Sequence, residues 1–317
     1  MMLSTRRQFV QSGAALTLAT SFAGFGAGAS ATSDTAGRLV LLGTRGGPFP
    51  TAYGATPSAN LLVYGGVPYI IDTGYGVTSK LLRAGVSLDN LSKIFITHHH
   101  SDHNLELGPL IYNAWVAGLR SALDVYGPLG LRALLTAYWQ SLAYDLAIRV
   151  ADEGRPELPA LVSTHEFSDE LVMESGDMRV SALRNYHPPV AESYSLKFEF
   201  GGKKVVFSGD TAYFPPLAEF AAGADYLVHE VFYPGAVAAM LKDRPNAPLL
   251  GASIRSHHTS PEDVGRIAAK AKVGTLVLTH FVPADERLVS PTMWTDAVRK
   301  TFSGRIVVGK DMMSFDL

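Results

Sequence analysis

The sequence contains no cysteine, which excludes disulfide bridges, zinc–thiolate clusters, iron–sulfur centres and cysteine nucleophiles. Charged residues are also scarce at 18%, and 27 basic against 29 acidic residues leave no basic surplus for a general electrostatic grip on nucleic acid. Beyond the N-terminal region there is no uninterrupted run of about 18 apolar residues, which argues against a membrane-spanning helix. Any metal ion must therefore be held by carboxylates and by the ten histidines.

The N-terminal region has the composition of an export signal. Arg6-Arg7 precede Phe9 and a weakly apolar stretch, and Ala29-Ser30-Ala31 fits an A-x-A cleavage site. The arginine pair resembles the bacterial twin-arginine signal, which implies the export machinery as a partner and a periplasmic or secreted location. An ordinary amphipathic helix and a retained anchor are the alternatives. We expect a signal peptide at 1–31 and a mature domain at 32–317 without a membrane anchor.

The mature chain alternates short apolar runs with longer amphipathic patterns, which is typical of mixed α and β structure. Strands are expected at 38–42, 59–64, 67–72, 93–97, 123–126, 177–183, 193–200, 203–208, 225–229, 275–279 and 305–308. Helices are expected at 77–84, 105–119, 129–148 and 261–271, the last capped by Ser260. Because strands and helices mix throughout, we predict two packed sheets with helices outside, in one two-lobed domain.

A cluster of possible metal ligands follows the expected strand at 93–97. The segment reads His98-His99-His100-Ser101-Asp102-His103, which is an H-x-H-x-D-H pattern. In an extended segment His98 and His100 point to the same side, whereas Asp102 and His103 fall where a helix begins. So many ligands in so few residues do not converge easily on one tetrahedral ion. Two neighbouring ions accommodate them naturally.

Three further strand ends carry ligand-type residues. His187 follows Asn185-Tyr186, Asp210 follows Ser208-Gly209, and His280 follows the run 275–279. Ligands at strand ends build a site at one edge of a sheet. Asp210 suits a bridging role, because a carboxylate has two oxygens and the preceding glycine permits a tight turn.

Together these segments resemble the metallo-β-lactamase-fold hydrolases over essentially the whole mature chain. The resemblance implies an α/β fold, a four-layer αββα sandwich with a dinuclear metal site at the sheet edge. It assigns two divalent ions, zinc by default, with manganese or iron as alternatives. One ion takes His98, His100 and His187, the other takes Asp102, His103 and His280, and Asp210 bridges them.

Other segments are similar to the ribonuclease Z and arylsulfatase-like branch of that family. They are Leu42-Gly43-Thr44, Tyr126-Gly127-Pro128, Val228-His229-Glu230 and His258-Thr259-Ser260. In that branch the histidine before Thr/Ser acts on the scissile group, which implies His258 here, with His257 as the alternative and Glu230 as its orienting carboxylate. We interpret His99, His165 and His229 as structural residues or as residues that support the metal ligands.

The expected function is hydrolysis of a small ester. A water that bridges two cations becomes a nucleophile near neutral pH, and Asp102 and Asp210 would orient it. An exported phosphodiesterase or arylsulfatase is the preferred interpretation, with His258, Asp102, Asp210 and Glu230 as catalytic residues. A lactonase or β-lactamase type of hydrolase is the alternative, and an inactive metal-binding or partner-binding scaffold is a third.

The sequence disfavours a ribonuclease Z that processes the 3′ end of tRNA. Such enzymes usually carry a projecting arm that grips the tRNA, in many of them between the lone histidine and the bridging aspartate. Here Asp210 follows His187 by only 23 positions, and those residues predict a simple hairpin. We therefore expect a small-molecule ester as substrate and no nucleic acid, and a homodimer stays open by analogy. The Gly/Pro-containing segments 48–57, 213–216 and 233–250 are expected as loops that set substrate choice.

Overall fold

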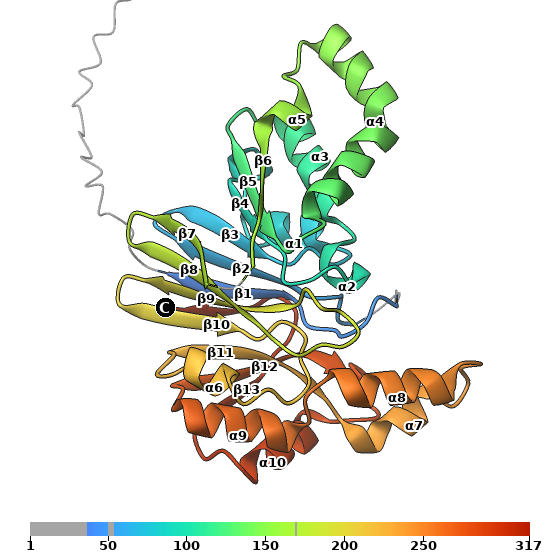
Figure 1. The fold of residues 1–317 in the computed structure, drawn as a ribbon, viewed down its shortest axis with the longest axis vertical. Coiled ribbons are helices and arrows are strands. Elements are labelled where there is room, and N and C mark those ends of the chain that lie inside the picture. Colours follow the sequence, from blue (N-terminus) through green and yellow to red (C-terminus); the bar gives the residue numbers. More distant parts are fainter. Residues whose placement is uncertain (1–36, 50–53, 169) are drawn as a thin grey trace, which may run out of the picture. The chain divides into compact units, whose positions relative to one another are not determined.

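The structure is a computed structural model that describes residues 37–49, 54–168 and 170–317. The expected signal peptide at 1–31 lies outside these residues. Two mixed β-sheets pack face to face, and helices cover both outer faces (Figure 1). The predicted four-layer αββα sandwich is confirmed.

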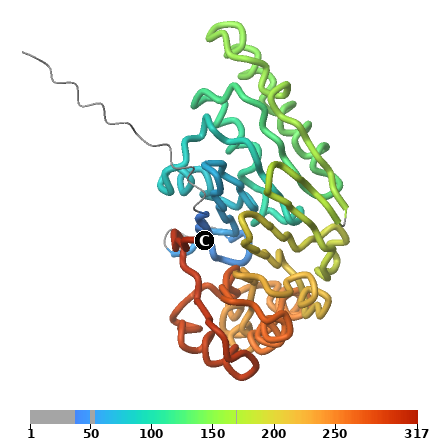
Figure 2. Tube along the Cα trace, turned by 90° about the vertical axis from the view of Figure 1, so that its left-hand side faces the viewer, coloured from blue at the N-terminus to red at the C-terminus, as the bar shows by residue number. Residues whose placement is uncertain are grey.

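The first sheet has the strand order β14-β1-β2-β3-β4-β5-β6. Its bounds are β1 Arg38–Gly43, β2 Ala59–Tyr64, β3 Val67–Ile71, β4 Lys93–Phe95, β5 Leu123–Gly127, β6 Val162–Glu166 and β14 Met313–Asp316. Strands β1 to β3 pair antiparallel, and β3 to β6 pair parallel. Because β14 pairs with β1, the C-terminus lies beside the first strand, as Figure 2 shows in the turned view.

The second sheet has the order β13-β12-β11-β10-β9-β8-β7. Its bounds are β7 Glu170–Ser175, β8 Met178–Arg184, β9 Tyr194–Phe200, β10 Lys203–Phe207, β11 Tyr226–Phe232, β12 Thr275–Val282 and β13 Arg305–Val308. Strands β10 to β13 are parallel, whereas β7 to β10 form antiparallel hairpins. The expected hairpin between His187 and Asp210 is β9–β10, and it carries no arm.

The helices divide between the two faces. Those over the first sheet are α1 Val77–Arg83, α2 Ser101–Asn104, α3 Leu107–Ala117, α4 Leu131–Glu153 and α5 Leu158–Leu161. The helices that come after β10 in the chain are α6 Leu217–Phe220, α7 Val237–Leu241, α8 Ala247–His257, α9 Pro261–Ala271 and α10 Pro291–Arg299. Two 3-10 turns lie at Leu88–Asn90 and Pro234–Ala236. None of the described helices combines the length and apolarity needed to cross a bilayer.

Side-chain alternation along the strands produces three layers of core. Leu39 and Leu41 of β1 face the second sheet, while Val40 and Leu42 pack against the helices outside the first sheet. This period of two is what a strand buried on both faces requires. Between the sheets Phe198 meets three other aromatic rings at centroid distances of 5.2 to 6.4 Å. A third cluster lies under α6, α9 and α10.

One predicted loop is wrong. The segment 233–250 contains the turn Pro234–Ala236, helix α7 and the start of α8. Its prolines suggested an irregular loop, but Pro248 occupies the first turn of α8, where a missing N–H costs no helical hydrogen bond. The segment is therefore largely helical, and helix α8 ends immediately before His258.

Candidate metal centre and active site

The H-x-H-x-D-H motif lies between β4 and α2. His98 and His100 precede the first turn of α2, whereas Asp102 and His103 belong to it. His98, Asp102 and His103 are buried, and His100 is half-buried. The motif is thus divided between two neighbouring groups of ligand-type atoms.

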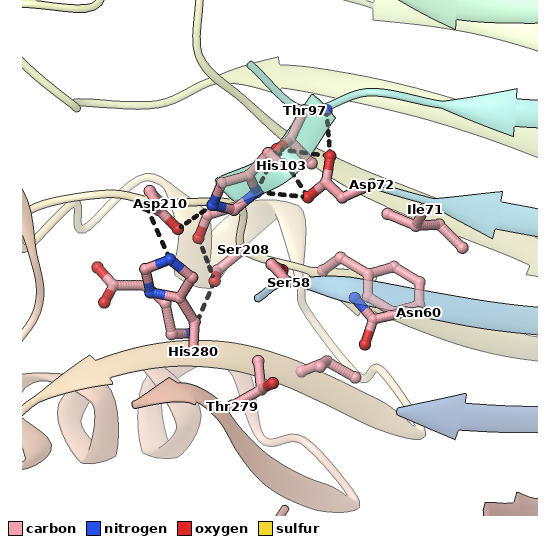
Figure 3. Close-up of a pocket in the computed structure, with 14 residues that line it drawn as sticks. Ser58, Asn60, Ile71, Asp72, Thr97, His103, Ser208, Asp210, Thr279 and His280 are labelled. Atoms are coloured by element: carbon pink, nitrogen blue, oxygen red, sulfur yellow. Dashed lines mark hydrogen bonds and ion pairs between the residues drawn. The ribbon is translucent and has the colours of Figure 1, made fainter. Parts of the chain in front are cut away.

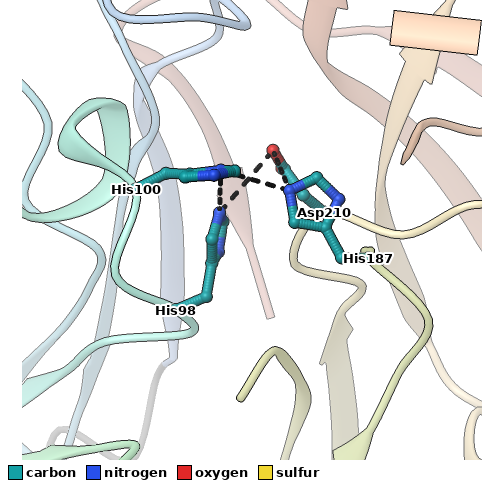
Figure 4. A group of neighbouring side chains, drawn as sticks. All are labelled: His98, His100, His187 and Asp210. Atoms are coloured by element: carbon teal, nitrogen blue, oxygen red, sulfur yellow. Dashed lines mark hydrogen bonds and ion pairs between the residues drawn. The ribbon is translucent and has the colours of Figure 1, made fainter. Parts of the chain in front are cut away.

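The first group consists of His98, His100, His187 and Asp210, which turn toward one another in Figure 4. The Nδ1 atom of His100 lies 3.1 Å from Nε2 of His98 and 3.2 Å from Nε2 of His187. His187 Nδ1 donates a hydrogen bond of 3.0 Å to the carbonyl of His257. In the neutral ring this leaves the Nε2 lone pair of His187 directed into the group.

Burial keeps the histidines of this group uncharged. It lowers the pKa of His98 well below its ordinary value, lowers that of His100, and lowers the pKa of His187 to about 4. Neutral imidazoles are the form that binds metal ions. The group therefore presents several lone pairs within a small volume at neutral pH.

The second group consists of Asp102, His103, Asp210 and His280. His280 Nε2 lies 3.3 Å from Oδ2 of Asp102 and 3.2 Å from Oδ2 of Asp210. His103 Nε2 lies 3.2 Å from Oδ1 of Asp210 (Figure 3). Burial opposes the charge on Asp102, but His103 and His280 outweigh it and lower the pKa of that carboxyl. Asp210 belongs to both groups, so it joins them into one site.

A bulge in β12 aims His280 into this site. Thr279 pairs with Glu230 of β11 and Phe281 pairs with Val231, so His280 has no partner in the ladder. Its φ of 47° lies in the left-handed region, which is uncommon for a residue other than glycine. A β-bulge of this kind re-aims a side chain at a strand end. The local strain is compatible with a functional position.

Gly209 allows the chain to turn before Asp210. Its φ is 59°, and a Cβ atom there would lie 2.5 Å from the carbonyl oxygen of Tyr194. Only glycine fits both the backbone conformation and this close approach. The turn at the end of β10 thereby brings the Asp210 carboxylate to the two histidine groups.

Asp72 is a member of the site that the sequence analysis missed. Its Oδ2 accepts a hydrogen bond of 2.7 Å from Nδ1 of His103, and its Oδ1 accepts one of 2.8 Å from the Thr97 backbone N–H (Figure 3). This fixes the tautomer of His103 and leaves its Nε2 lone pair facing the second group. The signal was the segment Ile71-Asp72-Thr73-Gly74, in which a carboxylate directly follows an apolar strand.

Glu230 and His258 form a pair at the edge of the site. Glu230 Oε1 accepts hydrogen bonds from the backbone N–H groups of Thr211 and Thr259, and Oε2 lies 3.2 Å from Nδ1 of His258. Burial disfavours the charged ring, but Glu230 outweighs it and raises the pKa of His258 to about 9. The centroid of the His258 ring lies 5.5 Å from that of the His280 ring, so the Glu230–His258 pair borders the second group.

The other histidines lie around the site without entering the two groups. His257 accepts from or donates to Ser253 within α8, and its ring lies 5.5 Å from that of His187. His229 Nδ1 donates to the Glu230 carbonyl. His99 lies against Asn104 and the Pro128 carbonyl, and His165 pairs with Asp124. Among the described residues none of these four is part of a candidate metal group.

The sequence and the fold both have known counterparts. Residues 53–280 match the Metallo-beta-lactamase superfamily. The chain belongs to this superfamily. The metallo-β-lactamase fold accounts for the two sheets, and membership makes the chain a metal-dependent hydrolase whose histidine and aspartate groups could bind divalent ions.

Relatives of the chain include proteins named ribonuclease Z. One from Mycobacterium marinum is 33% identical over 279 residues, covering 86% of this chain and 96% of the relative. One from Mycolicibacterium paratuberculosis is 34% identical with the same coverage of both chains. These names favour the ribonuclease Z interpretation over the small-ester interpretation that the sequence analysis preferred, and they give no support to an arylsulfatase.

Solved structures share the fold at lower sequence identity. The metallo-beta-lactamase fold protein YhfI from Bacillus subtilis has a TM-score of 0.66 at 22% identity, covering 89% of this chain and all of the other. The short form of human tRNase Z has a TM-score of 0.62 at 21% identity, covering 88% of this chain and 98% of the other.

Proposed function

We propose that the protein hydrolyses phosphodiester bonds in RNA, in the manner its ribonuclease Z relatives are named for. The observation that carries this proposal is the Glu230–His258 pair beside the two metal-ligand groups. A phosphodiester is anionic and gains negative charge in the transition state, so a protonated His258 offers it more than it offers a neutral carbonyl substrate. The relatives' names support the same substrate class.

The residues present fit two divalent ions. The buried Nε2 of His103 and Oδ1 of Asp210 have no hydrogen-bond partner, although such atoms seldom stay unpaired in a folded interior. His98, His100 and His187 would hold one ion, Asp102, His103 and His280 the other, and Asp210 would contact both. Nitrogen and oxygen ligands suit zinc, with manganese or iron as alternatives.

When bound, such ions supply a water nucleophile and neutralise charge on the phosphoryl oxygens. The chain itself supplies the proton chemistry. His258 donates a hydrogen bond to a non-bridging oxygen, or its proton to the leaving oxygen. Glu230 is a positioning residue that keeps the His258 ring charged and fixed in orientation, while two backbone N–H groups hold Glu230 itself.

A small phosphodiester is a second candidate substrate. The hairpin β9–β10 leaves no projecting arm between His187 and Asp210, and the formal net charge is −2. Both features favour a compact substrate over a large folded RNA. RNA and a small phosphodiester would be cleaved by the same chemistry. The rates of hydrolysis of an RNA and of an aryl phosphodiester therefore have to be compared directly.

The test uses the mature chain loaded with zinc or manganese. Initial rates are compared on a short single-stranded RNA, an aryl phosphodiester, an aryl sulfate and a lactone. We expect turnover of the two phosphodiesters, and a loss of about 100-fold or more in His258→Ala. The matched control is His165→Ala, which removes another carboxylate-paired histidine outside the site. Faster lactone or sulfate turnover, or full activity in His258→Ala, would refute the proposal.

Export remains part of the proposal. A twin-arginine signal at 1–31 would carry the protein to the periplasm or outside the cell, with no membrane anchor after cleavage. Replacing Arg6 and Arg7 by lysine should retain the precursor in the cytoplasm of a bacterial host. If the variant is found in the same cell fraction as the wild type, export by a twin-arginine signal is refuted. The proposed hydrolytic function is unaffected by that result.

A further inference from the structure

A loop between β1 and β2 lies directly against the second metal-ligand group. The N–H of Gly47 donates a hydrogen bond of 2.8 Å to Oδ2 of Asp102. The N–H of Gly46 donates to the carbonyl of Phe281, and a Cβ on Gly46 would lie 2.8 Å from Nδ1 of His280. Arg45, the residue before these glycines, is therefore held next to the site where the scissile group would sit.

Two arginines from distant segments meet on one aromatic ring beside this loop. The guanidinium carbon of Arg244 lies 4.1 Å from the ring centroid of Phe49, and that of Arg45 lies 5.7 Å from it. Arg244 comes from the turn between α7 and α8, and α8 ends at His258. Phe49 thus holds two like charges close together by cation–π contacts.

Neither guanidinium is neutralised by a carboxylate. No ion pair to Arg45 or Arg244 occurs in the described ranges, and the Nη1 atom of Arg45 is buried without a hydrogen-bond partner. Burial and the charge of Arg244 both lower the pKa of Arg45, and only Asp102 opposes them. Two adjacent cations with an unused buried donor are an arrangement that favours an anion.

Most of the other charged residues in the surrounding groove have ion-pair partners. The groove has a volume of about 1050 Å³ and is lined by Arg45, Phe49 and Arg244 among other residues. Two of its other cations are paired, Lys310 with Glu286 at 3.3 Å and Arg287 with Asp285 at 2.6 Å, whereas the exposed Lys242 has no ion pair within the described ranges. Asp311 is engaged by Lys80, and Asp243 is an exposed neighbour of Arg244 in the sequence. The unpaired cations of the groove are thus Arg45, Arg244 and Lys242, which precedes Arg244 by two positions.

We propose that Arg45 and Arg244 form a subsite for a phosphate group that neighbours the scissile phosphodiester of an RNA substrate. The proposal rests on the function proposed above. Successive phosphates of a single strand can occupy the metal site and this pair of guanidiniums, because the Arg45 loop touches Asp102 and His280. Guanidinium groups recognise phosphate oxygens through paired N–H donors.

The subsite separates substrates with one phosphate from those with several. An aryl phosphodiester carries only the scissile phosphate, whereas a short RNA carries its neighbours as well. Arg45→Gln and Arg244→Gln, tested in the metal-loaded enzyme, should each raise KM for the RNA by about tenfold. They should leave kcat/KM for the aryl phosphodiester within about twofold of wild type, since that substrate does not reach the subsite.

The matched control is Arg287→Gln, which removes a cation of the same groove that already has a carboxylate partner. Arg287→Gln should change neither KM for the RNA nor kcat/KM for the aryl phosphodiester. The slope of the logarithm of the RNA binding constant against the logarithm of the salt concentration should also decrease in magnitude by about one in Arg45→Gln and in Arg244→Gln. It should not change in the control. Equal losses on both substrates, or RNA kinetics unchanged in both variants, would overturn the subsite while leaving the phosphodiesterase function intact.

Failure of the underlying function has a different signature. If the wild-type enzyme cleaves neither the RNA nor the aryl phosphodiester, the proposed function is refuted. The subsite is then judged by fluorescence anisotropy with the same labelled RNA. Weaker binding by Arg45→Gln than by Arg287→Gln supports it, and equal binding by wild type and both variants overturns it.

Discussion

Replacing Asp72 by asparagine tests whether a buried carboxylate prepares the second metal-ligand group. Asp72 is 2% exposed. Its Oδ1 accepts a hydrogen bond from the Thr97 backbone N–H, and its Oδ2 accepts one from Nδ1 of His103. If the asparagine oxygen keeps the bond to Thr97, its NH₂ group faces the N–H of His103. Two donors then oppose each other, and the ring must shift its proton to Nε2 or rotate.

The size of the effect follows from what His103 loses. A proton on Nε2 occupies the position that faces Asp210, which lies 3.2 Å away. Removing such an orienting partner typically lowers metal affinity by about 10- to 100-fold. This corresponds to about 1.4 to 2.7 kcal/mol at 25 °C. The first group should keep its affinity, because the hydrogen bonds and ion pairs that the Asp72 side chain makes among the described residues go to Thr97 and His103 and not to a ligand of that group.

The assay is competition for zinc between the purified protein and a chromophoric chelator, which resolves a tight and a weakened site. The control is Asp124→Asn, which also removes a carboxylate from a histidine, His165 at 2.8 Å, but outside both groups. Wild-type affinity for both zinc ions in folded Asp72→Asn would refute the reasoning. An equal loss in Asp124→Asn would show that the effect is not local.

Three further predictions concern the proton donor, the core and a backbone turn. Glu230→Gln should lower the pKa of His258, so the alkaline limb of the pH–rate profile should move to lower pH by about one unit or more, and an unmoved limb would contradict the pairing. Phe198→Ala should lower the free energy of unfolding by about 3–5 kcal/mol in urea titrations, because that ring is fully buried between the sheets; a loss below about 1 kcal/mol would argue against this. Gly209→Ala should reduce both stability and zinc binding, since its Cβ would meet a backbone oxygen at 2.5 Å; wild-type zinc content in a stable variant would contradict this.

Regular elements with a strong local pattern were predicted closely. The helix expected at 261–271 has those bounds, and Ser260 caps it by accepting a hydrogen bond from the N–H of Asp263. The strands at 59–64 and 305–308 likewise have the expected bounds. In these cases the hydrophobic period, the cap and the turn residues agree, so neighbouring residues suffice to specify the element.

Elements that depend on distant partners were missed. Strand β14, Met313–Asp316, is short and exists as a ladder with β1 at the opposite end of the chain. Strand β7, Glu170–Ser175, lies at the edge of the second sheet and carries an irregular pairing with β8. The pairing of these two strands depends on the fold as a whole and not on a pattern within the segment.

The sequence by itself determined which side chains were available as ligands. Without cysteine, and with H-x-H-x-D-H followed by His187, Asp210 and His280 at strand ends, the ligand types and their edge of the sheet follow from local spacing. Only the tertiary structure decided which atoms meet. It set Asp72 against His103, aimed His280 through a bulge, and gathered Arg45 and Arg244 on Phe49. These contacts join residues far apart in the chain, and no local pattern records a pairing that packing of the two sheets creates.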